Sequence, residues 1–177
     1  DGGYITLAAG NYNMQVAQGA INFAVSDQWA GRLDAKLRER DGFLDDVNSN
    51  TDVGSLDRQM VRGQLAYEGE NSALRLIADW AADESICCAG AFTQSNVVNP
   101  LFNGLAASAG RTAYGSSNPS DLEVALSNTP TNDISEWGLS VEYNRALSDS
   151  NFTSITAYRD WESMAQVDGD QSGVDLV

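Results

Sequence analysis

The stretch RQMVRGQLAYE, residues 58–68, decides the fold class of this 177-residue chain. Its apolar face falls on every second position, at Val61, Gly63, Leu65 and Tyr67. The positions between them are mostly polar: Arg58, Arg62, Gln64 and Glu68, with Met60 and Ala66 among them. A period of two residues is typical of a β-strand that has one apolar and one polar face.

Three further segments repeat this alternation. They are EWGLSVEYN at 136–144, LRLIADWAAD at 74–83 and GRLDAKLRER at 31–40. The last two also fit an amphipathic helix, because apolar residues such as Leu33 and Leu37 recur at a spacing of four. Leu, Ala, Arg and Glu are also good helix formers. Taken alone, each of these two segments stays open between strand and helix.

Three weaker strands complete the set. A Gly10-Asn11 turn signal separates two of them, and the third is dense in β-branched and aromatic residues. The seven expected strands are residues 4–9, 14–26, 31–40, 58–68, 74–83, 134–145 and 152–161.

The connections after the second strand alternate in length. A short turn at Asp27-Gln28 is followed by a long acidic loop, 41–57, then by a short turn at 69–71, a very long loop, 84–133, and a short turn at 147–150. Outer-membrane barrels have short periplasmic turns and long outside loops. We therefore expect an all-β fold, an antiparallel up-and-down transmembrane β-barrel segment of about seven strands that is part of a larger barrel.

The side chains on the two faces agree with a barrel wall. Aromatic residues near the strand ends are expected at the membrane interfaces, since their rings are apolar with one polar handle; in a soluble sandwich they would instead fill a core. Charged residues on the other face are expected to point into the lumen, since burying unpaired charges in a dry core is costly. The interface aromatics are Tyr67, Trp80, Trp137 and Tyr143. The lumen-facing residues are Arg32, Asp34, Lys36, Arg38, Arg62, Arg75, Asp79 and Glu142.

The amino-acid composition argues against several classes of function. The chain has 10 Lys+Arg against 25 Asp+Glu, a formal net charge of −15, which disfavours nucleic-acid binding. It has no His, so Ser-His-Asp catalysis, imidazole bases and histidine zinc sites are excluded. We expect no enzyme activity, no cofactor and no resident metal.

Three local motifs each have a functional interpretation and an alternative in which the residues have no specific function. Cys87-Cys88 is a vicinal disulfide, a thiol ligand pair, or an inert loop sequence. Asp168 and Asp170 match the first positions of a calcium loop, with an acidic outside loop as the favoured alternative. Asp45-Asp46 could be a carboxylate pair for acid/base chemistry. The carboxylates of the loop 41–57 are those of Asp41, Asp45, Asp46, Asp52 and Asp57. They could also bridge divalent ions to lipopolysaccharide, with a solvated, hydrophilic loop as the favoured alternative.

Five segments together resemble the early barrel of TonB-dependent outer-membrane receptors. In chain order they are GNYNMQVAQGAINFAVSD (10–27), RLDAKLRERDGF (32–43), DRQMVRGQLAYEG (57–69), GLSVEYNRAL (138–147) and FTSITAYRDWE (152–162). The resemblance implies a barrel of about 22 strands with a plug in its lumen. The plug and the TonB-contacting segment have no counterpart here, so we expect residues 1–177 to be a fragment of a longer protein.

The resemblance also implies a function. A scarce ligand such as an iron-siderophore, a cobalamin or an oligosaccharide would bind the plug and the outside loops 41–57 and 84–133. The TonB complex would then pull on the missing plug region, so that the ligand crosses the outer membrane of a Gram-negative bacterium. The chain's other partner would be outer-membrane lipid. A passive porin-type barrel and a soluble extracellular all-β binding domain remain as alternatives.

Overall fold

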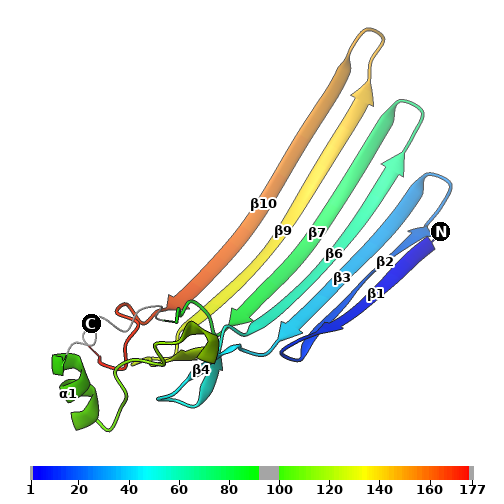
Figure 1. The fold of residues 1–177 in the computed structure, drawn as a ribbon. Coiled ribbons are helices and arrows are strands. Elements are labelled where there is room, and N and C mark those ends of the chain that lie inside the picture. The colour runs from blue at the N-terminus through cyan, green and yellow to red at the C-terminus, as the bar shows by residue number, and fades with distance from the viewer. Residues whose placement is uncertain (1, 92–99, 176–177) are drawn as a thin grey trace.

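A seven-stranded antiparallel sheet makes up most of the structure, a computed structural model that describes residues 2–91 and 100–175 (Figure 1). The sheet is a meander in which each strand pairs with the next strand of the sheet along the chain. Its strands, in spatial order, are β1 (Gly2–Gly10), β2 (Met14–Ala24), β3 (Trp29–Arg40), β6 (Leu56–Glu68), β7 (Ser72–Ser85), β9 (Thr131–Ala146) and β10 (Asn151–Gln166).

The two segments left open between strand and helix are strands. Residues 31–40 lie in β3 and residues 74–83 lie in β7, and each of these strands has a hydrogen-bonded neighbour on both sides. Pairing on both edges satisfies the backbone groups and outweighs the helix propensity of Leu, Ala and Arg. The expectation of an all-β chain with seven antiparallel strands is therefore confirmed.

The sheet is open. β1 and β10 form its two edges, and it does not close into a barrel (Figure 1). Within residues 2–91 and 100–175, no second sheet or helix layer packs on either face of the large sheet. Both faces are therefore available to surroundings other than this chain.

Both long connections lie at one end of the sheet. The opposite end has three tight turns, closed by backbone hydrogen bonds such as Val25 N–H to Trp29 O at 2.8 Å and Leu147 N–H to Ser150 O at 2.8 Å. One short turn, residues 11–13, shares the long-loop end; it is built on Tyr12 and Asn13 with φ of 56° and 51°. This left-handed pair matches the twist of a hairpin.

The long loops contain structure that the sequence does not predict. A second sheet has the order β5 (Thr51–Val53), β4 (Leu44–Asp46), β8 (Glu123–Val124), accompanied by α1 (Pro100–Ser108) and the short 3-10 helix η2 (Pro119–Asp121). Together with the segment after β10 they form a unit that we name the loop cap: residues 41–55, 86–91, 100–130 and 167–175. The predicted loop 84–133 also includes residues 92–99, which lie outside the described residues.

The hydrophobic core lies in the loop cap and not in the large sheet. Leu44, Val53, Val124 and Leu126 form one buried cluster. Ala106, Ala113 and Val174 form a second. In the large sheet, by contrast, Ala20 is the one hydrophobic side chain of the described residues that is buried. Among these residues, no helix is long and apolar enough to cross a membrane.

Candidate functional site

One face of the large sheet is mostly apolar, and we name it the apolar face. On the edge strand β10 this face also contains two acids, Asp160, which lies opposite Trp137, and Glu162. The strand register places side chains from neighbouring strands in rows across the sheet. The middle row reads Ile21, Leu33, Gly63, Ala78, Leu139 and Tyr158. The next row toward the tight turns contains Phe23, Gly31, Leu65, Leu76, Val141 and Thr156.

Large apolar side chains on this face are exposed in the isolated chain. Leu139 is 51% exposed, Val61 43% and Trp80 42%. A contiguous exposed apolar surface marks contact with a membrane or a partner.

The apolar face has a defined height. A row of carboxylates ends it on the loop-cap side, where Glu39, Asp57, Glu84 and Asp133 lie side by side on four neighbouring strands. On β3, the apolar stretch from Trp29 to Leu37 covers eight residue steps, about 26 Å along the strand. With the strand tilt usual in barrels this gives a height of about 20 Å, close to the apolar band of about 25 Å around transmembrane barrels.

The four predicted interface aromatics all lie on the apolar face. Trp80 and Trp137 are directly opposite each other on β7 and β9. Tyr67 and Tyr143 lie near the tight turns. Each of these two tyrosines has an aromatic neighbour outside the predicted set: Trp29 has its ring centroid 5.1 Å from that of Tyr67, and Phe152 has its centroid 6.4 Å from that of Tyr143.

The opposite face, which we name the polar face, contains the eight predicted charged residues, and most of them form ion pairs. Arg32 contacts Asp34 at 2.7 Å, and Arg75 contacts Glu142 at 3.7 Å. Four charged residues of this face were absent from the predicted lumen-facing set and also form pairs there: Arg58, Asp83, Glu136 and Arg159. The ion pairs of Arg159 on the edge strand β10 depend on the strand register, and the local sequence gives no signal for them.

Charge is strongly segregated between this face and the rest of the molecule. Eight of the chain's ten Lys and Arg residues lie on the polar face, namely Arg32, Lys36, Arg38, Arg40, Arg58, Arg62, Arg75 and Arg159. Its acids are Asp34, Glu68, Asp79, Asp83, Glu136 and Glu142. The polar face is thus net positive in a chain whose net charge is −15.

The loop cap is held together by a buried carboxylate. Asp46 is 2% exposed and accepts hydrogen bonds from the Leu126 N–H at 3.0 Å, the Asn48 N–H at 3.2 Å and the Ser49 hydroxyl. Its neighbour Asp45 is exposed and lies opposite Asp52 in the β4–β5 pair. Because successive residues of a strand point to opposite sides, Asp45 and Asp46 do not form a carboxylate pair.

The calcium-like segment is part of the same cap. Asp168 is buried and accepts hydrogen bonds from the Ser127 N–H at 2.7 Å and the Gln171 N–H at 3.0 Å. Asp170 accepts one from the Ser172 N–H at 2.8 Å. Asp168 therefore joins the segment after β10 to the loop before β9, whereas the hydrogen bond of Asp170 stays within that segment. The described residues contain no group of three or more Cys, Asp or Glu side chains placed to hold a metal ion.

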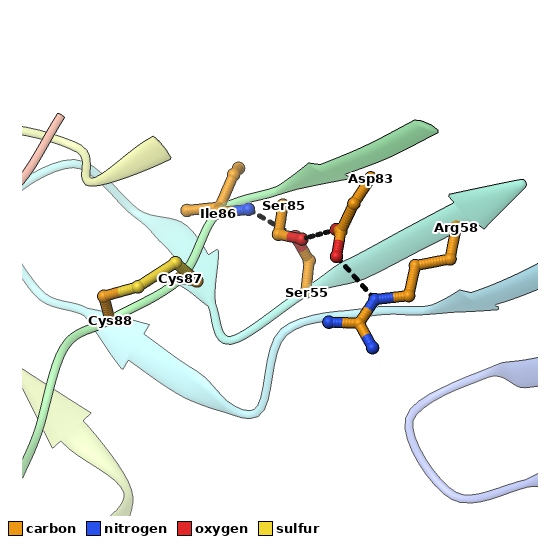
Figure 2. Close-up of a disulfide and its surroundings, with 7 residues drawn as sticks. All are labelled: Ser55, Arg58, Asp83, Ser85, Ile86, Cys87 and Cys88. Atoms are coloured by element: carbon orange, nitrogen blue, oxygen red, sulfur yellow. Dashed lines mark hydrogen bonds and ion pairs between the residues drawn. A yellow bond between two sulfur atoms is a disulfide. The ribbon is translucent and has the colours of Figure 1, made fainter. Parts of the chain in front are cut away.

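Cys87 and Cys88 form a disulfide in the first residues after β7 (Figure 2). The preceding residue, Ile86, is fixed to the β5–β6 connection: its carbonyl accepts from the Gly54 N–H at 2.7 Å, and its N–H donates to the Ser55 hydroxyl at 3.0 Å. Cys88 has a φ of 77°. The disulfide therefore lies at the point where the chain leaves the large sheet and enters the loop cap.

The chain matches no family model, no curated protein and no solved structure. The functional conclusion therefore depends on the two faces of the sheet, on the loop cap, and on the sequence resemblance described above.

Proposed function

We propose that this chain forms part of the wall and outside loops of a transmembrane β-barrel in the outer membrane of a Gram-negative bacterium. In this proposal the apolar face contacts lipid and the polar face lines the lumen. The barrel is of the TonB-dependent receptor kind and takes up a scarce ligand such as an iron-siderophore complex.

The observation that carries the proposal is the contrast between the two faces of a single-layered sheet. The apolar face presents rows of unpartnered Leu, Val, Ile and Trp side chains, bounded by a row of carboxylates. The polar face carries ion pairs that need a wet or protein-filled space beside them. A soluble sandwich would need the apolar face covered by a second layer, whereas a barrel wall needs lipid there.

The open edges support a larger barrel. In hydrocarbon, each unpaired backbone group costs several kcal/mol, so a sheet can span a bilayer only when further strands close it. β1 and β10 each lack a partner on one side among the described residues. Additional strands, as in a barrel of about 22, would satisfy both edges.

The receptor function rests on the sequence resemblance, and the loop cap is compatible with it. The cap lies at the end of the sheet where a barrel of this orientation would open to the outside. Concave surfaces with a few polar groups are suited to small ligands. The energy for uptake would come from the TonB complex acting on a plug in the lumen.

Single-tryptophan variants test the barrel proposal. Trp80 lies on the apolar face and Trp161 on the polar face. In vesicles whose lipid acyl chains carry bromine, which quenches indole fluorescence on contact, we expect strong quenching of a variant that keeps only Trp80. A variant that keeps only Trp161 serves as the matched control and should be quenched weakly. Both variants are made in the full-length protein, whose further strands close the barrel. Equal quenching of both variants, or failure of this full-length protein to enter the vesicles, would contradict the proposal.

A transport measurement separates the receptor from a passive porin. In cells that produce the full-length protein, TonB-coupled uptake of an iron-siderophore stops when a protonophore collapses the inner-membrane proton gradient. Passive diffusion through a porin-type barrel continues under the same treatment. Persistent uptake would therefore replace the receptor proposal with the porin alternative while leaving the barrel wall intact.

A further inference from the structure

Three cations lie side by side on the polar face, close to the loop cap. Arg38 on β3 is directly opposite Arg58 on β6, and Lys36 is two residues from Arg38 on the same face. Like charges placed directly opposite each other destabilise a sheet unless an anion compensates them. An anion is therefore needed to offset the repulsion among Lys36, Arg38 and Arg58.

The chain supplies only part of that charge. Arg58 pairs with Asp83 on β7. Among residues 2–91 and 100–175, no carboxylate forms an ion pair with Lys36 or Arg38. The other arginines farther along this face, Arg32, Arg62, Arg75 and Arg159, each contact a carboxylate. Arg40, next to Arg38 on the same face of β3, also forms no ion pair among these residues, but its guanidinium donates to the Gly54 carbonyl and lies over the Phe43 ring. The uncompensated charge is therefore concentrated at Lys36 and Arg38.

These cations line a hollow with an apolar floor. The hollow has a volume of about 310 Å³, and Met60, Ala81 and Ile134 also line it. Two carboxylates line it as well, Asp83, which pairs with Arg58, and Glu136. Glu136 is already engaged by Arg159 at 3.0 Å. We name this site the basic hollow. Its volume is at the lower end of the range for small-molecule sites, which combine apolar walls with a few placed polar groups.

We propose that the basic hollow binds a small organic oxyanion, a carboxylate or phosphate group carried on an apolar body. Arg38 and Lys36 donate to the oxyanion, since a guanidinium presents a planar fork that suits carboxylate and phosphate oxygens and an ammonium adds a point charge. The apolar body lies against Met60 and Ile134. The inference rests on the proposed function in one respect, namely that the polar face is open to solutes rather than covered by a second layer.

Binding by the folded protein in detergent micelles tests the proposal. The probes are benzoate, phenyl phosphate and benzamide, which share a ring and differ in charge, followed by saturation-transfer NMR. We expect saturable binding of benzoate or phenyl phosphate that weakens with added salt, and no comparable binding of benzamide. The arm that binds more tightly identifies the oxyanion type. Equal binding of benzamide, or no saturable binding of either anion, would overturn the proposal and leave an acidic protein segment as the occupant.

Three variants locate the site. Lys36→Gln with Arg38→Gln should weaken anion binding at least tenfold, whereas the charge-conserving Lys36→Arg with Arg38→Lys should keep most of it. Arg75→Gln, the matched control, removes a cation of the same face near the tight turns and should change binding less than twofold. An equal loss in the control would mean that the anion is attracted by the total charge of the polar face and does not bind specifically in the basic hollow. Lipid quenching of Trp80 in the same preparation reports separately on the barrel, so failure of one proposal is distinguishable from failure of the other.

Discussion

Arg159 on β10 forms an ion pair with Asp79 on β7 across the full width of the strand between them. The Nη2 atom of Arg159 lies 2.9 Å from Oδ1 of Asp79. The position between the two residues on β9 is Gly138, which pairs with Asp79 on one side and with Arg159 on the other. A Cβ atom at Gly138 would lie 3.1 Å from the Arg159 Nη2 atom. Because Gly138 has no side chain, there is room over β9 for the Arg159 side chain to reach Asp79.

The first prediction concerns the space over Gly138 that the Arg159 side chain occupies. Gly138→Val should displace the Arg159 guanidinium from Asp79, because a branched side chain fills the space over β9. Gly138→Ala is the matched control, since the end of a flexible arginine can move by the few tenths of an ångström that one methyl needs. A double-mutant cycle with Asp79→Asn and Arg159→Gln should give a measurable coupling free energy when Gly138 is present and none in the Gly138→Val background. Undiminished coupling in that background would show that the pair does not depend on the gap.

The second prediction concerns the buried carboxylate of the loop cap. Asp46→Ala removes the acceptor of the Leu126 N–H, and an unsatisfied buried donor costs about 1–3 kcal/mol. We expect faster hydrogen exchange in the peptides that contain β4, β5 and β8, measured by mass spectrometry, with little change in the large sheet. Asp45→Ala removes the neighbouring exposed carboxylate and should leave the exchange of the cap unchanged. Equal effects of the two substitutions would mean that Asp46 acts only through its charge.

The large sheet could be predicted from the sequence because the side chains of its two faces differ in polarity. Within β6, Val61, Leu65 and Tyr67 alternate with mostly polar residues such as Arg62 and Gln64, and this alternation can be recognised without knowledge of neighbouring strands. The strand ends were harder to predict. β10 extends to Gln166, five residues beyond the expected 161. The alternation gives no signal for this extension, because the acids Asp160 and Glu162 occupy positions on the apolar face.

The loop cap and the new ion pairs could not be predicted, since they depend on contacts between distant residues. Asp46 meets Leu126 only after the long stretch of chain between them has folded, a separation of 80 positions. Arg159 meets Asp79 through the register of three strands. Gly138 carried a weak signal, because a glycine within a strand often marks the close approach of another group. Nothing in the single sequence identifies which group that is.

The third prediction tests which face meets lipid. Leu139 lies in the middle row of the apolar face, so Leu139→Arg should destabilise the protein in lipid vesicles by about 2–4 kcal/mol, the cost of Arg at the midplane of a barrel's outer surface. Ser140→Arg places the same side chain on the polar face of the same strand and should cost much less. Denaturant unfolding in vesicles measures both. A larger loss for Ser140→Arg would reverse the assignment of the two faces.

The fourth prediction concerns the Cys87–Cys88 disulfide, which connects two anchored parts of the chain. Ile86 is fixed to the β5–β6 connection (Figure 2). Beyond the disulfide, the Gly90 N–H donates to Gln171 Oε1 at 3.2 Å. Between these anchors the chain passes through the φ of 77° at Cys88, a conformation that a residue with a side chain rarely adopts without support. Bonding the two sulfur atoms restricts the backbone of both cysteines at this bend.

Reduction should therefore loosen residues 87–91 and leave the large sheet intact. We expect no alkylation of the purified protein before reduction and two alkyl groups per chain afterwards, read by mass spectrometry. Limited proteolysis should then cut between Ile86 and Gly90 faster in the reduced protein. The double substitution Cys87→Ser with Cys88→Ser should be cleaved as fast as the reduced protein, and adding reductant should not change that rate. Cleavage at the same rate before and after reduction would show that the anchors at Ile86 and Gly90 fix this bend by themselves, without the disulfide.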